Sequence, residues 1–109
     1  MNVSKTRGGK TPKLKGDRFE VEVANYFRAQ GADCERIRQG QGEIIDLIVV
    51  SPSSQINQSI VYYVQCRLRG NMTIAERDLL RRTAQRVGAI PILACKNSKN
   101  EIDILALSL

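Results

Sequence analysis

Histidine and tryptophan are absent from this 109-residue chain, and its three cysteines, Cys34, Cys66 and Cys95, include no CxxC pair. A chain without histidine cannot form a His-based triad, and an odd set of scattered cysteines is untypical of a disulfide scaffold or a zinc module. No apolar run approaches the roughly 18 residues that a membrane span needs, and the polar, basic N-terminus is unlike a secretory signal. The protein is therefore expected to be cytoplasmic and neither secreted nor membrane-spanning, with its cysteines as small buried residues.

Acidic residues are in the minority. The 17 Lys and Arg against 11 Asp and Glu give a formal net charge of +6, which favours a polyanionic partner. We predict a flexible basic arm over residues 1–14 and one folded domain over residues 15–109; the alternative for the arm is a solubilising tail. The cations near the N-terminus, with no acid among them, are Lys5, Arg7, Lys10, Lys13 and Lys15.

The apolar pattern predicts two helices and five strands. Apolar spacings of three and four residues indicate the helices, and Thr73 with Glu76 forms a capping-box pattern before the second. The run at 44–50 is nearly all apolar, which predicts a strand inside a sheet covered on both faces. The fold class is α/β, with a mixed central sheet flanked by helices in the order αβββαββ. Helices are expected at 16–30 and 73–87, and strands at 34–38, 44–50, 60–67, 90–95 and 102–107.

Four polar residues are the candidates for chemistry. Asp46 interrupts an apolar run, where a carboxylate is costly unless it is hydrogen-bonded, paired or bound to a metal. The alternation of a strand places Gln65 and Arg67 on one face, next to Asp46 if the two strands pair. Glu20 lies beside the apolar stripe of the first helix. The alternatives are a solvated acid at a strand end and an ordinary exposed helix acid.

Three segments resemble known nucleases. Lys15-Gly16-Asp17-Arg18-Phe19-Glu20 is similar to the Lys-Gly-x-x-x-Glu opening of archaeal Holliday-junction resolvases. The stretch from Gly40 to Ile48, GQGEIIDLI, resembles the glycine-rich turn and Ile-Asp strand of Mrr-type restriction endonucleases, and Tyr63-Val64-Gln65-Cys66-Arg67 resembles their Val-Gln-Cys-Lys motif. Both families belong to the PD-(D/E)XK group, so the resemblance, over about residues 15–96, implies a restriction-endonuclease-like core.

The resemblance also implies a site and an activity. Glu20, Asp46, Gln65 and the backbone carbonyl of Cys66 would hold Mg²⁺ or Mn²⁺, and Glu20, Asp46, Gln65 and Arg67 would be the catalytic set. The implied activity is endonucleolytic hydrolysis of branched (Holliday-junction) or duplex DNA. Arg67 departs from the family, which has lysine there: arginine stays protonated and cannot act as a base, although it can clamp a phosphate oxygen.

Basic residues around these motifs are candidate phosphate contacts. The four arginines of the second expected helix, Arg77, Arg81, Arg82 and Arg86, form either a further contact surface or a solvated face. The scarcity of aromatic residues argues against base stacking on single strands. The candidate DNA-binding residues are Lys10, Lys13, Lys15, Arg36, Arg38 and Arg69.

Three hypotheses remain open at this point. The first is an endonuclease; the second is a nuclease-fold DNA-binding module or subunit, catalytically weakened or inactive, whose partner protein does the chemistry; the third is a basic structural protein that uses the fold as a scaffold. A homodimer is expected from the resolvase resemblance and from residues 102–109, which are apolar on both strand faces. A DNA partner implies a nucleoid-associated location.

Overall fold

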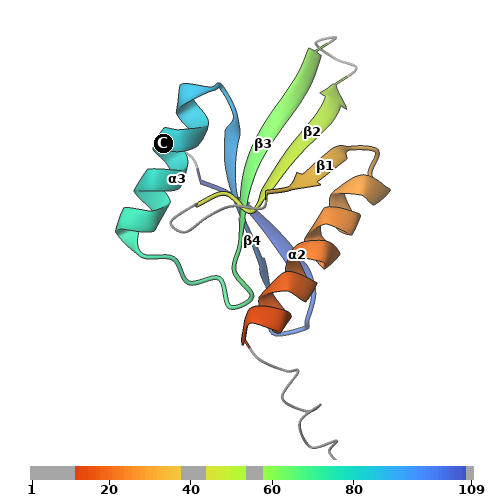
Figure 1. Cartoon of the computed structure of the whole chain (residues 1–109), viewed down its shortest axis with the longest axis vertical. Coiled ribbons are helices and arrows are strands. Elements are labelled where there is room, and N and C mark those ends of the chain that lie inside the picture. Colours follow the sequence, from red (N-terminus) through yellow and green to blue (C-terminus); the bar gives the residue numbers. More distant parts are fainter. Residues whose placement is uncertain (1–11, 38–43, 54–57, 108–109) are drawn as a thin grey trace, which may run out of the picture.

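The computed structural model, which describes residues 12–37, 44–53 and 58–107, contains a five-stranded mixed sheet and two helices (Figure 1). The predicted order αβββαββ is confirmed. The elements are α2 (Pro12–Ala29), β1 (Asp33–Arg36), β2 (Leu47–Ser53), β3 (Gln58–Cys66), α3 (Ile74–Arg86), β4 (Ile90–Lys96) and β5 (Ile102–Ala106).

The strands lie in the sheet in chain order, β1-β2-β3-β4-β5. All neighbours are antiparallel except β3 and β4, which are parallel and are connected through α3. Arg36 and Val64 both pair with Leu47, and Cys66 pairs with Ala94. The end of β1, the start of β2 and the ends of β3 and β4 therefore meet at one end of the sheet.

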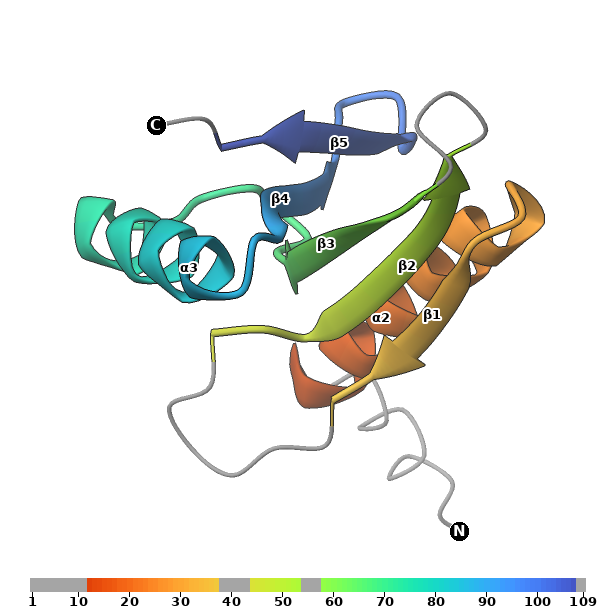
Figure 2. The ribbon, with the colours of Figure 1, turned by 90° about the horizontal axis from the view of Figure 1, so that it is seen from above.

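The two helices cover opposite faces of the sheet (Figure 2). Along β4 the side chains alternate: Ile92 and Ala94 join the core that includes Phe19 and Val23 of α2, whereas Leu93 joins the core around Leu80 of α3. This alternation is the two-residue period of a strand. The sheet is thus the middle layer between two small cores.

Helix α2 begins at Pro12, four residues before the predicted start. Proline suits the first turn of a helix, because its missing N–H has no intrahelical acceptor there. The last three residues of the expected arm, 12–14, are thus helical, and residues 1–11 lie outside the described residues. Neither described helix has the length and apolar character needed to cross a membrane.

Helix α3 begins with the predicted capping box. Thr73 Oγ1 accepts a hydrogen bond from Glu76 N at 3.0 Å, and Glu76 Oε1 accepts one from Thr73 N at 2.9 Å. The predicted apolar stripe is only partly buried: Leu80 and Ala84 are fully buried, whereas Ile74, Leu79 and Val87 are exposed. Helix α3 packs mainly against β3 and β4, so only a narrow stripe of its own surface is buried.

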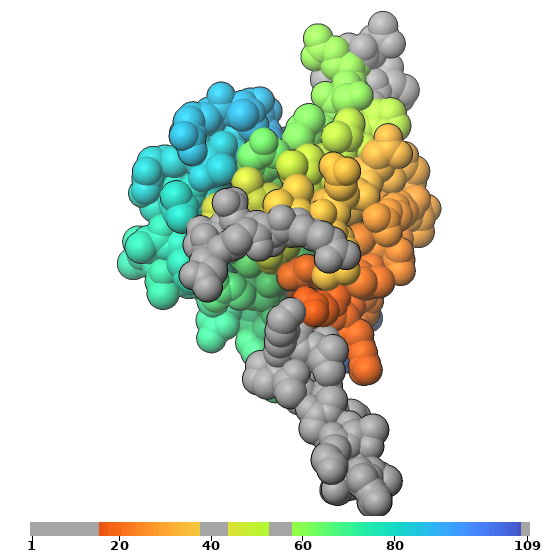
Figure 3. Space-filling view, viewed as in Figure 1, coloured from red at the N-terminus to blue at the C-terminus, as the bar shows by residue number. Residues whose placement is uncertain are grey.

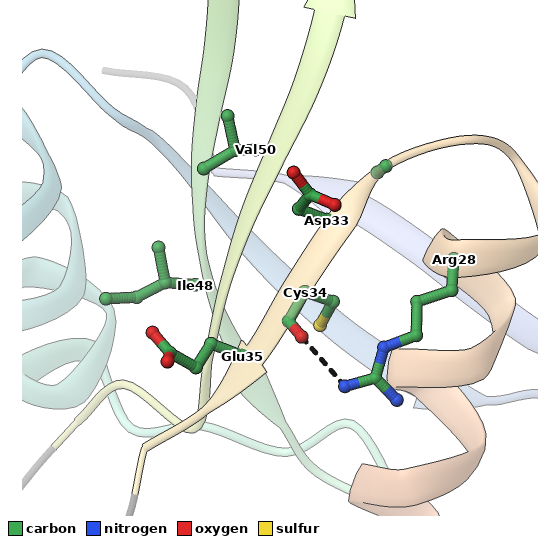
Figure 4. A pocket seen from close by; sticks show the side chains of 7 residues that line it. Arg28, Asp33, Cys34, Glu35, Ile48 and Val50 are labelled. Carbon is green, nitrogen blue, oxygen red and sulfur yellow. Dashed lines mark hydrogen bonds between the residues drawn. The ribbon is translucent and has the colours of Figure 1, made fainter.

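Strand β2 differs from its prediction in two respects. It begins at Leu47, and Ile44 and Ile45 precede it as buried loop residues in the α3-side core. Only its α2 face is fully covered, because Ile48 and Val50 on the other face are half-buried. They line a groove of about 410 Å³, shown in Figure 4, beside acidic side chains of β1. Its lining residues are Arg28, Ala32, Asp33, Cys34, Glu35, Ile48 and Val50.

The cysteines are free thiols, and the expectation that they are buried is met in full only by Cys95. Cys95 is buried, and Cys34 and Cys66 are half-buried against the α2-side core. Burial raises the pKa of the Cys34 and Cys95 thiols. All three therefore behave as small hydrophobic residues.

Candidate active site

Asp46 lies where three strands meet, and its carboxylate is almost entirely buried, with 7% of the residue exposed. Oδ2 accepts hydrogen bonds from Gln65 Nε2 at 2.6 Å and from Cys66 N at 2.8 Å. The backbone of Asp46 donates to Val64 O and accepts from Ile37 N. Asp46 therefore connects the chain after β1, the start of β2 and the end of β3.

The environment of Asp46 favours the neutral carboxyl. Desolvation is the largest cause that raises the pKa of Asp46, and the nearby negative charge of Glu20 also raises it. The hydrogen bonds from Cys66 and Gln65 and the charge of Arg67 oppose this, and the net result is a rise in the pKa from 3.8 to about 6. The same cause, burial, raises the pKa of the Cys66 thiol far above its usual range. The buried carboxylate of Asp46 is destabilised by the nearby charge of Glu20. A cation bound beside them would stabilise both charges.

Glu20, on α2, faces this end of the sheet and is held by Arg36 of β1. Arg36 Nη2 donates to Glu20 Oε1 at 3.0 Å and lies 3.8 Å from Asp17 Oδ1. The Arg36 Nε atom is buried and has no hydrogen-bond partner among the described residues. Arg36, predicted to contact DNA, thus packs inward against an acid that was predicted to bind metal.

Arg67 follows β3, and its guanidinium is held on the side of the sheet where α3 begins. Nη2 donates to Glu76 Oε2 at 2.7 Å and Nη1 donates to Asn71 O at 3.2 Å. Glu76 accepts from the backbone of Thr73 and from Arg67, and both interactions lower its pKa. The four predicted catalytic residues therefore share one end of the sheet, with Glu20 on the α2 side and Arg67 toward α3.

The donor set at this end suits a hard cation. Asp46 and Glu20 supply carboxylates, and Gln65 and Cys66 can supply an amide and a backbone carbonyl oxygen, which are the ligands that Mg²⁺ accepts. Among the described residues, no group of three or more Cys, Asp or Glu side chains is placed to hold a metal. The four residues therefore fit a metal site with two carboxylate ligands and two neutral oxygen ligands.

The predicted DNA contacts have different outcomes. Lys10 and Arg38 lie outside the described residues, and Lys13 and Lys15 fall in the first turn of α2, where only the backbone is described. Arg69 is exposed on the turn after β3. It lines a groove of about 400 Å³ with the turn after β4; the lining residues are Leu68, Arg69, Lys96, Asn97, Ser98 and Asn100.

Sequence reasoning missed the partners of two arginines. Glu76 was identified only as the last residue of a capping box, and Asn71 was not identified at all. The capping-box pattern indicates a partner for one carboxylate oxygen of Glu76. It gives no indication that the second oxygen would reach Arg67. The pairing of Arg36 with Glu20 joins residues 16 positions apart in the chain, so no local pattern could indicate it.

Two comparisons with known proteins indicate a nuclease-like α/β domain. The structure is similar to that of the Holliday junction resolvase Hjc from the archaeal hyperthermophile Archaeoglobus fulgidus, with a TM-score of 0.66 and 16% sequence identity, over 85% of this chain and 73% of that chain. At that identity the likeness establishes the fold. The restriction endonuclease family model Mrr_cat matches residues 11–99, and the chain therefore belongs to this restriction endonuclease family. A search of curated proteins gives no match.

The raised pKa of Asp46 predicts a pH-dependent gain in stability for Asp46→Asn. Because the folded-state pKa is raised from 3.8 to about 6, the stabilisation by protonated Asp46 is complete below pH 3.8 and is lost as the pH rises through 6. Asparagine can accept the same two hydrogen bonds and does not ionise. The free energy of unfolding of Asp46→Asn, relative to wild type, should rise by about 2 kcal/mol between pH 4 and pH 8.

Urea unfolding in EDTA measures this difference. Asp78→Asn is the matched control, because Asp78 is an exposed acid that accepts a hydrogen bond from Arg82 on α3. Its stability relative to wild type should change little over the same range. If the free energies of unfolding of wild type and Asp46→Asn changed in parallel with pH, the raised pKa of Asp46 would be contradicted.

Proposed function

We propose that this protein is a metal-dependent endonuclease that hydrolyses phosphodiester bonds in branched or duplex DNA. The observation that carries the proposal is the buried Asp46 carboxylate, which accepts hydrogen bonds from Gln65 and Cys66 and has Glu20 and Arg67 within electrostatic reach. A carboxylate desolvated beside a second acid costs folding free energy. Family membership supports metal binding as its use.

In this proposal each residue has a distinct role. Asp46 and Glu20 would hold Mg²⁺ or Mn²⁺, assisted by the amide oxygen of Gln65 and the carbonyl of Cys66, and the Gln65 amide N–H orients Asp46. The bound cation would supply Lewis-acid chemistry at the scissile phosphate. Arg67 contacts the phosphate and offsets its charge, since a guanidinium stays protonated and cannot take a proton from water.

A second candidate function is DNA binding without cleavage. It is favoured by the identity of Gln65, a neutral amide where the wider PD-(D/E)XK group usually has a carboxylate, and by the ion pair in which Arg36 engages Glu20. Both features lower the negative charge available to a cation. In this case a partner protein would supply the chemistry.

Asp46→Asn is expected to separate the two candidates. Under the endonuclease proposal, wild type cleaves a four-way junction or a linear duplex with Mg²⁺ or Mn²⁺. Asp46→Asn should then lose at least about 100-fold in single-turnover rate, equivalent to about 2.7 kcal/mol of barrier, and bind DNA with nearly wild-type affinity in EDTA.

The control is Asp78→Asn, which removes the same charge from the exposed face of α3 and should cleave at the wild-type rate. Native-rate cleavage by correctly folded Asp46→Asn would show that the site is elsewhere. An inert wild type with both cations, retaining DNA affinity, would favour the binding module.

DNA is proposed to approach the end of the sheet where Asp46 lies. The groove beside Arg69 adjoins it, because Arg67 N donates to Ala94 O and Lys96 N donates to Leu68 O, which fastens the turn after β3 to β4. In the view of Figure 3 strands β2 and β3 reach the surface between α2 and α3. The turn at Arg69 thus presents an exposed cation beside the candidate site.

Arg69→Gln is expected to remove one phosphate contact. The slope of log affinity against log salt should become shallower by about 0.9, as measured by fluorescence anisotropy with a duplex in EDTA. Arg86→Gln is the control, since Arg86 ends α3 near the start of β4, at the opposite end of the sheet. Equal slopes for the two variants would exclude Arg69 from the interface.

We propose in addition that the protein acts as a homodimer through its C-terminal region, on DNA of the nucleoid in the cytoplasm. Edge strand β5 carries Leu105, which is 45% exposed, and a symmetric junction requires two related sites. Sedimentation at micromolar concentration should give twice the 12.2 kDa chain mass, and Leu105→Lys should shift the protein to the monomer. A 12.2 kDa species alone would contradict the dimer.

The location is tested separately, by imaging a fluorescent fusion of the protein in cells.

A further inference from the structure

An arginine at the end of β3 presents a difficulty for a cation site. A guanidinium beside a carboxylate ordinarily forms a bidentate ion pair with it. Such a pair between Arg67 and Asp46 would occupy the carboxylate that the proposed function assigns to a metal. A lysine ammonium, with a single nitrogen, has no second arm for such a pair.

The structure shows a different partner for Arg67. Its two terminal nitrogens donate to Glu76 Oε2 and to Asn71 O. The hydrogen bonds to the Asp46 carboxylate come from Gln65 and Cys66, and both are on Oδ2. Arg67 thus acts on Asp46 through its charge, while a competing carboxylate holds the guanidinium.

Glu76 is itself held in place. Its Oε1 accepts from Thr73 N, and its backbone N–H donates to Thr73 Oγ1, so the capping box restricts the side chain at the first turn of α3. The side chains of Arg67 and Glu76 are both about one-third exposed, at 32% and 34%. The second oxygen, Oε2, is thereby directed at Arg67 from a rigid element.

We propose that Glu76 is a positioning residue that holds Arg67 off Asp46. It keeps Asp46 Oδ1 available to a divalent cation, and it leaves the remaining N–H groups of Arg67 for a substrate phosphate. The inference deepens the proposed function and rests on it. In this proposal Glu76 compensates for the arginine at position 67, where the family has lysine.

Glu76→Gln separates this role from helix capping. Glutamine is equally suited to the capping box, so its oxygen can keep the bond to Thr73 N, while the charge that pairs with Arg67 is lost. Asp78→Asn is the matched control, because it removes one negative charge from the same helix and touches Arg82 instead. Each change is also made in an Arg67→Ala background.

The measurement is Mn²⁺ binding to DNA-free protein, followed by electron paramagnetic resonance of the free ion. Glu76→Gln should weaken binding about tenfold, because the released guanidinium competes for Asp46; tenfold corresponds to about 1.4 kcal/mol. Asp78→Asn should stay within about twofold of wild type, since exposed charges are well screened. In the Arg67→Ala background Glu76→Gln should have no further effect.

Equal affinities for Glu76→Gln and Asp78→Asn would overturn the positioning role, as would a loss that persists without Arg67. If wild-type protein bound no Mn²⁺ at millimolar concentration, the proposed metal site would fail. The positioning role would then be decided by the crystal structure of metal-free Glu76→Gln. Arg67 bonded to Asp46 would support it, and Arg67 still away from Asp46 would overturn it.

Discussion

The burial of the Asp46 carboxylate is the constraint on which this end of the molecule depends. A buried charge requires donors, and the two that it has, Cys66 N and Gln65 Nε2, both belong to the end of β3. Those bonds require β2 and β3 to keep the register that pairs Leu47 with Val64. A slip by one residue would exchange the faces of the strand and leave the carboxylate without its donors.

Much of the fold was predictable from the sequence because its elements are marked locally. The capping box at Thr73 predicted the start of α3, and apolar runs separated by polar turns predicted the strands and their order along the chain. The start of β2 was not predictable, because Ile44 and Ile45 are apolar in a strand or in a buried loop alike. Only the tertiary structure shows that the chain bends at Asp46 and that both isoleucines pack toward α3.

The candidate site was predictable to a different degree. Asp46 could be found because it interrupts an apolar run, and strand alternation placed Gln65 and Arg67 together. The partners of the arginines could not be found, since a long side chain reaches acids far away in the sequence. Arg36 was accordingly expected to face DNA, yet it engages Glu20 on α2. The rule that cations near a motif contact phosphate does not account for acids on a neighbouring helix.

The pattern of charges distinguishes Asp46 from the acids around it. Glu20 is paired with Arg36 and Glu76 with Arg67, whereas Asp46 is satisfied by an amide and a backbone N–H, both neutral. Neutral donors orient a carboxylate without cancelling its charge, and the charge of Arg67 acts on Asp46 while the guanidinium itself donates to Glu76 and Asn71. A scaffold gains nothing from that arrangement, because an apolar side chain of similar volume would be more stable. A site that receives a cation does gain, because the charge is retained for the ion and the flanking arginines are held back by acids of their own.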